Sequence, residues 1–412
     1  MASDYFAPGV YIEEVDRGSR SIKGFNMSVA GFVGFTEDIR GEAQIFRPML
    51  ISNWSQYLHF FAKPRSDGFT DFGAYLPFSV QGWFINGGER CWIVSIGTQL
   101  PNTSQCDDAD SVHFIRNLLG SRDNGAGIKG LYEIDEVSMV TCPASSLAYE
   151  KGLIDIDQLH NVMEAMLSMC ENSDSGPAYR MAVIDLPPIQ PSKSMEPVDP
   201  SRHRPVDAAK WLDLFNRHSQ FGSTYYPWIK VPDPHNGGRP KHIPPSGHMM
   251  GILSYRNKSC GTFQISIKES PQGIIGFSHE LNIQEQQLLI SMVINCISSS
   301  ILVNSNLIVF NARTLSGADD TDWCYVSVRR LMSYIERSIE RGTQWVVFEP
   351  NDSDLWARVE RSVRGFLERL WRDGSLMGSS PSEAFYVKCD GDINTQDTIA
   401  QGNLYIDVGV SL

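Results

Sequence analysis

The sequence predicts a multidomain chain of the α/β and α+β classes, with a parallel sheet in its middle part. Its 412 residues are enough for two or three domains, and 42% hydrophobic with 20% charged residues is an ordinary globular composition. Strand and helix patterns alternate through the middle of the chain, which is typical of a parallel α/β layer. The run 342–374 then joins a strand pattern, a capped turn and an amphipathic helix pattern without a break.

The first expected element is a short strand near the N-terminus. It follows a polar segment that ends in Pro8 and Gly9. A strand at a chain end needs a partner edge, which belongs either to the same subunit or to a neighbour, the second case being strand addition. The expected strand consists of Val10, Tyr11, Ile12, Glu13, Glu14 and Val15.

Alternating elements are expected from residue 28 to residue 186. Helices are expected at 52–61, at 72–84 with a kink at Pro77, and at 155–170, where apolar residues recur every three or four positions. The strands expected between them are 28–35, 91–96, 137–142 and 180–186. Proline-rich segments near 187–205 and 232–247 are expected to be surface loops, separated by an aromatic strand around Tyr225.

The last third of the chain is expected to begin with a helix. Asn282 and Glu285 have the spacing of a capping box, and apolar residues recur at helical spacing from Leu288 to Ile297. A strand at 307–312 and a helix at 328–339, ended by Gly342, follow. Two further strands are expected at 384–390 and 404–410.

The run 342–374 carries the clearest local signals. The β-branched and aromatic content of 344–349 predicts a buried strand that Pro350 stops, and Asn351–Asp354 offers N-cap side chains. Gly374 is expected to end the helix that follows. Its buried face is expected to consist of Leu355, Val359, Val363, Phe366 and Leu370.

The opposite face of this helix is predicted to be basic. Arg361, Arg364 and Arg372 point away from the apolar face, and Arg358 and Arg369 lie on its border. The chain as a whole carries a formal net charge of -13, so a basic face is suited to an acidic partner. The alternative is a solvated surface whose arginines form ordinary i,i+4 pairs with glutamates.

Composition argues against several classes of protein. An acidic chain does not bind nucleic acid through its whole surface, because that requires many lysines and arginines. The first residues have no basic segment followed by an apolar one, and no apolar run approaches the roughly 20 residues that span a bilayer. We therefore expect synthesis and folding in the cytosol. The eight scattered cysteines are expected to be small buried hydrophobes.

Signatures of enzymes and cofactor sites are absent from the sequence. Glycines 125, 127 and 130 match a phosphate-binding pattern but do not follow a strand, so we interpret them as a flexible loop. His235, His242 and His248 lack a cysteine or paired carboxylate nearby, which favours a polar surface loop over a metal site. Ser278 and His279 are adjacent, whereas a catalytic triad draws on separate elements. We expect no catalytic residue, metal or cofactor.

Ten segments, in order along nearly the whole chain, resemble the tail sheath proteins of contractile phages. The resemblance is stronger to the single-chain sheath proteins of phage-tail-like contractile injection systems. Each segment is weakly specific alone, but ten in one order are highly specific. They are PGVYIEEV from Pro8, SVAGFVGF from Ser28, NGGERCWIV from Asn86, VSMVTCP from Val137, YYPWIKV from Tyr225, IPPSGHMMGI from Ile243, NARTLS from Asn311, GTQWVVFEPND from Gly342, LWRDGSLMG from Leu370 and EAFYVKCD from Glu383.

The resemblance implies a structural and mechanical role. Sheath subunits of this family form stacked rings of six around a rigid inner tube, with baseplate and cap proteins at the ends, and contract when the baseplate triggers them. Terminal arms donate strands to a sheet on a neighbouring subunit. The particle is assembled in the bacterial cytoplasm and is then released or anchored. No nucleic acid, membrane insertion or nucleotide is implied, so exchanged subunit interfaces must supply the energy of contraction.

The resemblance also implies a domain plan and site residues. Residues 1–25 are expected to be the arm and its lead-in, 26–275 a non-catalytic α/β domain often called subtilisin-like, and 276–412 a C-terminal α+β domain that faces the inner tube. The expected tube contacts are Arg358, Arg361, Arg364, Arg369 and Arg372. The expected C-terminal sheet includes Leu404, Tyr405, Ile406 and Val408.

Several alternatives stay open at this point. Family members usually continue beyond the strand equivalent to 404–410 with a C-terminal arm, whereas this sequence ends at Leu412. The sheath of a phage virion and that of a bacterial injection particle are not separated by these residues. An α/β hydrolase-like enzyme would need a clustered catalytic set, and a nucleic-acid or membrane binder would need basic or apolar surfaces.

Overall fold

The computed structural model divides the chain into two compact units. The body unit is Phe25–Arg337, and the terminal unit combines Ser338–Leu412 with the N-terminal residues up to Gly24. The expected boundary at residue 276 therefore differs from the observed one, because the strands after it extend the sheet of the body. The structure describes residues 20–64, 73–99, 108–173, 176–177, 179–187, 203–233, 238–259, 271–300, 306–309, 312–317 and 320–412.

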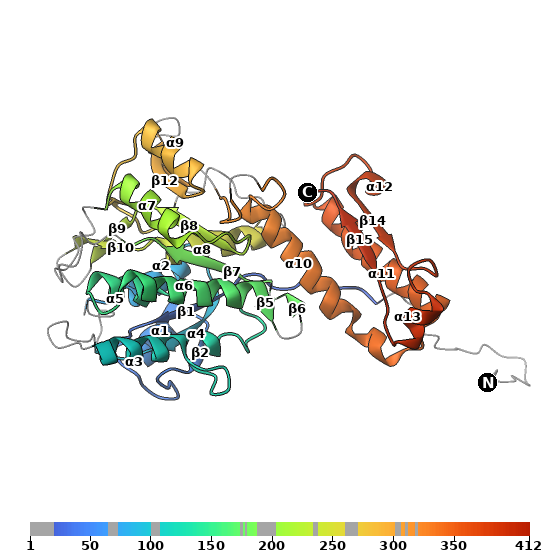
Figure 1. Cartoon of the computed structure of the whole chain (residues 1–412), viewed down its shortest axis with the longest axis horizontal. Coiled ribbons are helices and arrows are strands. Elements are labelled where there is room, and N and C mark those ends of the chain that lie inside the picture. Colours follow the sequence, from blue (N-terminus) through green and yellow to red (C-terminus); the bar gives the residue numbers. More distant parts are fainter. Residues whose placement is uncertain are drawn as a thin grey trace, which may run out of the picture. The chain divides into compact units, whose positions relative to one another are not determined.

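An eight-stranded sheet forms the centre of the body (Figure 1). Its strand order is β13-β12-β8-β7-β4-β1-β3-β2, and the six inner strands are parallel while β2 and β13 pair antiparallel at the two edges. The predicted parallel α/β layer is confirmed. The strands are β1 Val29–Gly34, β2 Pro48–Ile51, β3 Arg90–Ser95, β4 Met139–Thr141, β7 Met181–Asp185, β8 Gly222–Tyr226, β12 Asn295–Ser300 and β13 Asn306–Val309.

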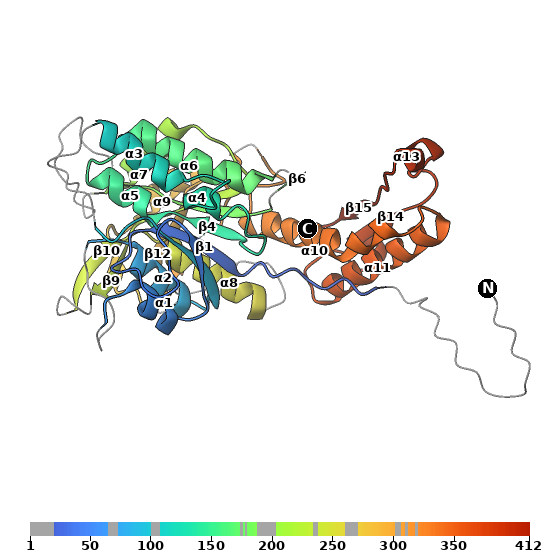
Figure 2. The same ribbon diagram turned by 90° about the horizontal axis from the view of Figure 1, so that it is seen from below.

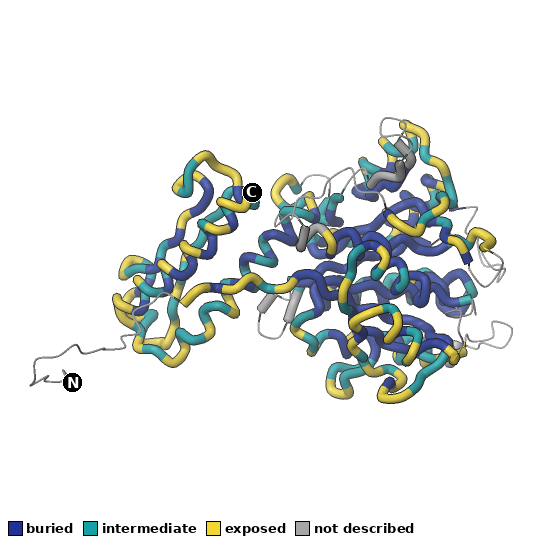
Figure 3. Tube along the Cα trace, turned by 180° about the vertical axis from the view of Figure 1, so that it is seen from behind, coloured by how far each residue is buried: buried dark blue, intermediate teal, exposed yellow. Residues whose placement is uncertain are grey.

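Helices cover both faces of this sheet. The helices α3 to α7 lie on one side and α1, α2 and α8 on the other (Figure 2). Every residue of β1, β7 and β8 is buried, which is expected of parallel strands between two helical layers. Figure 3 shows buried residues through the middle of the body. The helices are α1 Trp54–Phe61, α2 Leu76–Ile85, α3 Asp108–Leu119, α4 Gly127–Gly130, α5 Pro143–Glu150, α6 Ile156–Glu171, α7 Pro205–Phe215, α8 Ser246–Ser259 and α9 Ile283–Ser291.

Small sheets complete the body. The strands β9 Ile229–Asp233, β10 Arg239–Ile243 and β11 Gly276–Phe277 form one, and β5 Asn172–Ser173 pairs with β6 Gly176–Pro177. The expected loop at 232–247 thus contains the end of β9 and the whole of β10, which pair antiparallel. Most of the expected loop at 187–205 and the whole segment 10–15 lie outside the described residues.

Three local predictions in the body need correction. The helix after Asn282 has the predicted capping box but ends at Ser291, and Cys296 and Ile297 bury their side chains in the sheet on β12 instead. Helix α2 starts at Leu76 with Pro77 in its first turn, where a missing N–H costs nothing, so no kink is needed. The glycines 125–130 include the short helix α4, and Gly127 packs against the backbone of Gly120, where a Cβ would approach to 2.7 Å.

The terminal unit is built around one long amphipathic helix. The unit takes in the end of α10 Val326–Thr343 and continues with a 3₁₀ helix η5 Gln344–Phe348, α11 Ser353–Arg372, α12 Pro381–Ala384, β14 Phe385–Lys388, α13 Gln396–Ala400 and β15 Asp407–Val410. The predicted apolar face of α11 is confirmed, since its five residues are at most 6% exposed. Both predicted ends are confirmed: Asp352 Oδ1 accepts from Leu355 N at 2.8 Å, and Gly374 follows the helix at a φ of +77°.

The predicted buried strand 344–349 is wrong. Helix α10 runs almost directly into η5, and none of the residues 344–348 is buried. Val347 is 81% and Phe348 91% exposed. Their β-branched and aromatic character suits a strand, but a strand also needs a neighbour to pair with, and none of the described strands pairs with this segment.

Candidate interaction surface of the terminal unit

The outward face of α11 presents three arginines to solvent. Arg364 Nη2 lies 2.9 Å from Glu360 Oε1, and Arg372 pairs with Glu368, each one helical turn away. These arginine side chains are 51% and 66% exposed, so their ion pairs are screened and easily exchanged. Arg361 is exposed, and within the described part of the chain no ion pair is found for it. The predicted basic face is therefore present as a surface feature.

The two border arginines are held within the unit. Arg358 Nη2 forms an ion pair of 2.9 Å with Glu349 Oε2, and its guanidinium lies 5.5 Å from the centre of the Trp345 ring. The Glu349 carboxylate raises the pKa of Arg358. Arg369 donates to Ser21 Oγ at 2.9 Å and to the carbonyl oxygen of Ile22 at 2.5 Å. The sequence spacing predicted that both arginines lie at the border of the apolar face of α11, but it did not predict these partners.

Residues 20–22 dock onto the terminal unit, which sequence reasoning missed. Ile22 is 1% exposed, and its branched carbons face Gly342 near the end of α10. The guanidinium of Arg20 lies 5.0 Å from the Trp345 ring centre. No local pattern could have predicted this contact, because the partners are separated by more than 300 positions in the sequence.

The predicted C-terminal sheet is present but shorter than expected. The strands β14 and β15 pair antiparallel, with Val387 opposite Val408. Leu404, Tyr405 and Ile406 precede β15 instead of belonging to it, and Asn394 holds Tyr405 through bonds of 2.7 Å and 3.0 Å to its backbone. Among the described strands no third one joins this sheet, so each strand has one edge without a partner strand.

The tip of η5 adds an apolar feature to the same unit. Val347 and Phe348 expose most of their surface, and the ion pair of Arg358 with Glu349 connects the residue after them to α11. Two adjacent large apolar side chains at such exposure are candidates for a protein contact. The sequence prediction assigned them to a buried strand and so did not recognise them.

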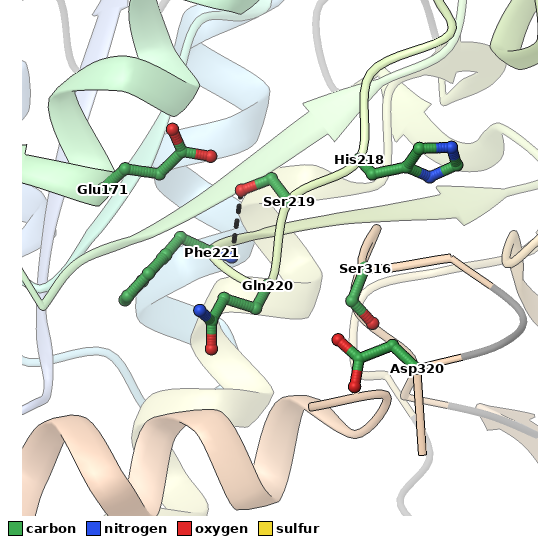
Figure 4. Close-up of a pocket in the computed structure, with 7 residues that line it drawn as sticks. All are labelled: Glu171, His218, Ser219, Gln220, Phe221, Ser316 and Asp320. Atoms are coloured by element: carbon green, nitrogen blue, oxygen red, sulfur yellow. Dashed lines mark hydrogen bonds between the residues drawn. The ribbon is translucent and has the colours of Figure 1, made fainter. Parts of the chain in front are cut away.

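The body holds an open polar pocket of about 370 Å³. Figure 4 shows its lining, which consists of Glu171, His218, Ser219, Gln220, Phe221, Ser316 and Asp320.

The polar groups of this pocket already bind other parts of the chain. Glu171 accepts from Arg217 at 2.7 Å, Gln220 accepts from Arg329 at 3.1 Å, and Ser219 Oγ accepts from the backbone N–H of Phe221. Among the described residues, no hydrogen bond joins this hydroxyl to His218 or Glu171, which line the same pocket, so Ser219 has no base that would activate it as a nucleophile. We assign this pocket no chemistry.

The histidines singled out from the sequence occupy unrelated places. His235 lies outside the described residues, His248 is 2% exposed inside the body, and burial lowers its pKa to about 4. His279 Nε2 lies 3.0 Å from Glu285 Oε1, the carboxylate of the α9 capping box. Within the described ranges, no group of three or more His, Cys, Asp or Glu side chains could hold a metal ion.

Five of the six cysteines in the described residues are buried, as predicted. Burial raises the pKa of Cys142 and of Cys170 to about 12, so both stay as thiols. Cys324 is half-buried, and Cys106 and Cys260 lie outside the described residues. The buried free cysteines are Cys91, Cys142, Cys170, Cys296 and Cys389. In the regions covered by the structure, none of the helices is both long and apolar enough to cross a membrane.

Comparison with known proteins finds a family model that matches the C-terminal part of the chain and solved structures that share the fold of the whole chain. Residues 318–412 match the family model of the phage tail sheath C-terminal domain. None of the curated protein sequences matches the chain. The resemblance stated from the sequence is confirmed by this family match and by solved structures that share the fold.

Three of the similar solved structures are sheath proteins. The sheath of the PVC extracellular contractile injection system in its contracted state is 22% identical with a TM-score of 0.69, covering 100% of this chain and 95% of that chain. The contracted helical sheath of the anti-feeding prophage is 24% identical with a TM-score of 0.69, covering 99% and 96%. A sheath tail protein from Desulfitobacterium hafniense is 7% identical with a TM-score of 0.57, covering 93% and 94%.

Proposed function

We propose that this chain, which has the fold of contractile sheath subunits along its whole length, is the sheath subunit of a phage tail-like contractile injection system. The observation that carries the proposal is the full-length match to sheaths solved in the contracted state, together with the sheath family match at residues 318–412. The role is structural, and the subunit polymerises with copies of itself.

The polymer consists of stacked rings of six subunits around an inner tube, with baseplate and cap proteins at its ends. The 6-fold symmetrised baseplate of the anti-feeding prophage, which contains a chain of this fold, supports this arrangement. Contraction repacks contacts between body units, and the energy comes from that exchange of interfaces. Assembly takes place in the bacterial cytoplasm, and the finished particle is released or anchored.

The N-terminal arm links neighbouring subunits by strand addition. Residues 10–15 have strand composition, and the sheet of β14 and β15 has edges at which main-chain groups can accept a further strand. Main-chain hydrogen bonds of this kind persist when the arm swings. The receiving sheet would use β15 with Val408 and the approach segment Leu404, Tyr405 and Ile406.

The outward face of α11 binds the inner tube. Arg361, Arg364 and Arg372 form the exposed basic face, which suits acidic groups on the tube. Arg358 and Arg369, also expected as tube contacts, have partners inside the unit and contribute less. Ion pairs between these exposed arginines and acidic groups of the tube are weakened by solvent screening, so they can form during assembly and be released during contraction.

Charge reversal on this face is expected to block assembly without unfolding the subunit. Changing Arg361, Arg364 and Arg372 to Glu replaces two exposed i,i+4 pairs by like-charge pairs, at a total cost of about 1–2 kcal/mol before further solvent screening. This is small beside an ordinary folding stability of about 5–15 kcal/mol. The triple variant, co-expressed with tube and baseplate proteins, should still unfold cooperatively, with a melting temperature only several degrees below that of the wild type, but should yield bare tubes by electron microscopy. Normally sheathed particles would exclude a tube-binding role for the face.

Deletion of residues 2–15 tests the arm. The shortened subunit is expected to fold, because the deletion leaves the whole body unit Phe25–Arg337 and the segment Ser338–Leu412 of the terminal unit intact, but not to form sheaths that survive contraction. Particles are triggered to contract and imaged by electron microscopy. Intact contracted sheaths would contradict the assignment of the arm.

The sheath of a contractile phage virion is the second candidate, because the matching family model describes a phage tail sheath domain. Capsid genes beside the coding gene would favour it. An α/β hydrolase-like enzyme has no comparable support.

A further inference from the structure

We propose that Gly342, Trp345 and Arg369 form a socket that fixes the root of the N-terminal arm to the terminal unit. This arm socket binds residues 20–22, so that tension on the arm enters the terminal unit first. The inference about tension rests on the proposed sheath function, whereas the docking of the root does not.

Ile22 is the apolar anchor of the arm root. It is 1% exposed, whereas its neighbours Ser21 and Lys23 are both exposed. The fit depends on the absence of a side chain at position 342: a Cβ there would lie 2.7 Å from both Cγ1 and Cγ2 of Ile22. The Ile22 side chain fills the space that a side chain at position 342 would occupy. Any displacement of residue 22 along the chain would therefore lose this close packing.

Arg369 fixes the backbone of the same residue. One guanidinium binds Ser21 Oγ at 2.9 Å and the carbonyl oxygen of Ile22 at 2.5 Å, which joins two successive residues to one rigid, planar group. The last turns of α11 hold that arginine, with Leu370 buried beside it. The arm root is thereby connected to the longest helix of the terminal unit.

Trp345 closes the socket on its third side. Its ring has the Arg20 guanidinium at 5.0 Å and the Arg358 guanidinium at 5.5 Å, and its Nε1 donates to the carbonyl oxygen of Gly342 at 2.9 Å. This explains why η5 follows α10 so closely: the short helix positions the indole next to Gly342. The three socket residues come from α10, η5 and α11.

The order of anchors along the chain gives the socket its mechanical role. A pull on residues before Arg20 meets the socket first and only later the body, where the carbonyl oxygen of Met27 accepts from Arg330 at 2.9 Å and β1 begins at Val29. Without the socket, the pull would pass through Gly24 directly to β1. The terminal unit carries the proposed tube-binding face and the receiving sheet, so the socket keeps the links between subunits on one rigid unit.

Limited trypsin digestion of the full-length monomer tests the docking. Cleavage after Arg20 and Lys23 requires that the root leave the socket, so its rate follows the open population. Arg369→Ala removes two hydrogen bonds from a charged donor and should raise cleavage at these two bonds about tenfold. Arg372→Ala is the matched control: Arg372 lies three residues along the same helix, and its ion-pair partner among the described residues is Glu368 at the surface, so this variant should cleave like the wild type.

A second variant keeps the test valid if Arg369→Ala disturbs α11. Ile22→Ala lies outside all helices and should also raise cleavage, with an unchanged circular dichroism melting curve. Equal cleavage of Arg369→Ala, Ile22→Ala and the wild type would overturn the socket.

The mechanical role is tested on assembled particles. Arg369→Ala subunits should assemble around the tube, but the sheath should separate into short pieces when contraction is triggered, whereas wild-type sheaths stay whole. Whole contracted sheaths from Arg369→Ala, with trypsin cleavage raised, would refute the mechanical role but not the docking. If wild-type subunits form no sheath with the tube and baseplate proteins, the proposed function fails and the digestion result still stands.

Discussion

A single methyl group at position 342 is expected to loosen the arm root. Gly342 is the penultimate residue of α10 and has no left-handed backbone, so an alanine there is compatible with the helix. By helix propensity alone, Gly→Ala within a helix stabilises by about 0.5–1 kcal/mol. The new Cβ, however, would lie 2.7 Å from two carbons of the buried Ile22 side chain and 3.0 Å from its Cβ.

The steric term is expected to exceed the propensity term. Ile22 is β-branched and has few rotamers, and forcing extra volume into a packed contact costs about 1–3 kcal/mol. The net expectation for Gly342→Ala is a loss of about 1 kcal/mol in the free energy that holds the root in place. Gly365→Ala is the matched control, because a Cβ at that exposed position of α11 meets nothing within 4 Å. It should stabilise α11 by about 0.5–1 kcal/mol.

Hydrogen exchange followed by mass spectrometry measures both effects in the full chain. Peptides that cover residues 20–24 and the last turn of α10 should exchange several-fold faster in Gly342→Ala, and peptides of α11 should exchange more slowly in Gly365→Ala. In an Ile22→Ala background the two contacts of 2.7 Å with Cγ1 and Cγ2 are gone and only the one of 3.0 Å with the Cβ remains, so Gly342→Ala should accelerate exchange less than it does in the wild type. Protection of residues 20–24 in Gly342→Ala equal to that of the wild type would refute the packing argument.

Two further predictions concern the buried carboxyl at the end of β7 and the apolar tip of η5. Burial raises the pKa of Asp185 to about 7 against the opposing effect of its hydrogen bonds from Ser246, so the stability it contributes is complete below about pH 4 and is lost as pH rises through about 7. By calorimetry, Asp185→Asn should therefore have a higher melting temperature than the wild type at pH 8. Its melting temperature should also fall less steeply than that of the wild type between pH 4 and 7. Burial also raises the pKa of Glu150, to about 8, so part of the pH dependence of the melting temperature remains in the variant. A pH dependence in Asp185→Asn identical to that of the wild type would contradict the role given to Asp185. Phe348→Ser removes a side chain that is 91% exposed, so the melting temperature should not change, while sheath yield by electron microscopy should fall; unchanged yield would show that the tip is not an interface.

The local elements of this protein could be predicted wherever neighbours in the sequence decide them. Helix α11 is such a case: Asp352 caps it, Gly374 ends it, and the apolar residues between them recur with the helical period. The capping box of α9 and the alternation of buried strands and helices in the body are of the same kind. Each of these signals is built from residues a few positions apart, the range over which backbone geometry places side chains on one face.

The errors fall where a distant partner decides between two locally acceptable states. Cys296 and Ile297 fit the helical spacing of α9, but β12 places them in the sheet, where Cys296 lies opposite Tyr226 of β8 and Ile297 opposite Val309 of β13. The residues 344–348 fit a strand, but no strand of the described chain pairs with them and η5 forms instead. In both places, the presence or absence of a strand to pair with outweighs the local propensity.

The sequence by itself determined the α/β body, the amphipathic α11 with its basic face, and the resemblance to sheath proteins. Only the tertiary structure decided that Arg369 holds residues 21 and 22 while Arg361 faces solvent, and that Val347 and Phe348 are exposed. The physical reason is that periodicity assigns a residue to a face of its own helix, whereas its partner is set by which chain segment folds against that face.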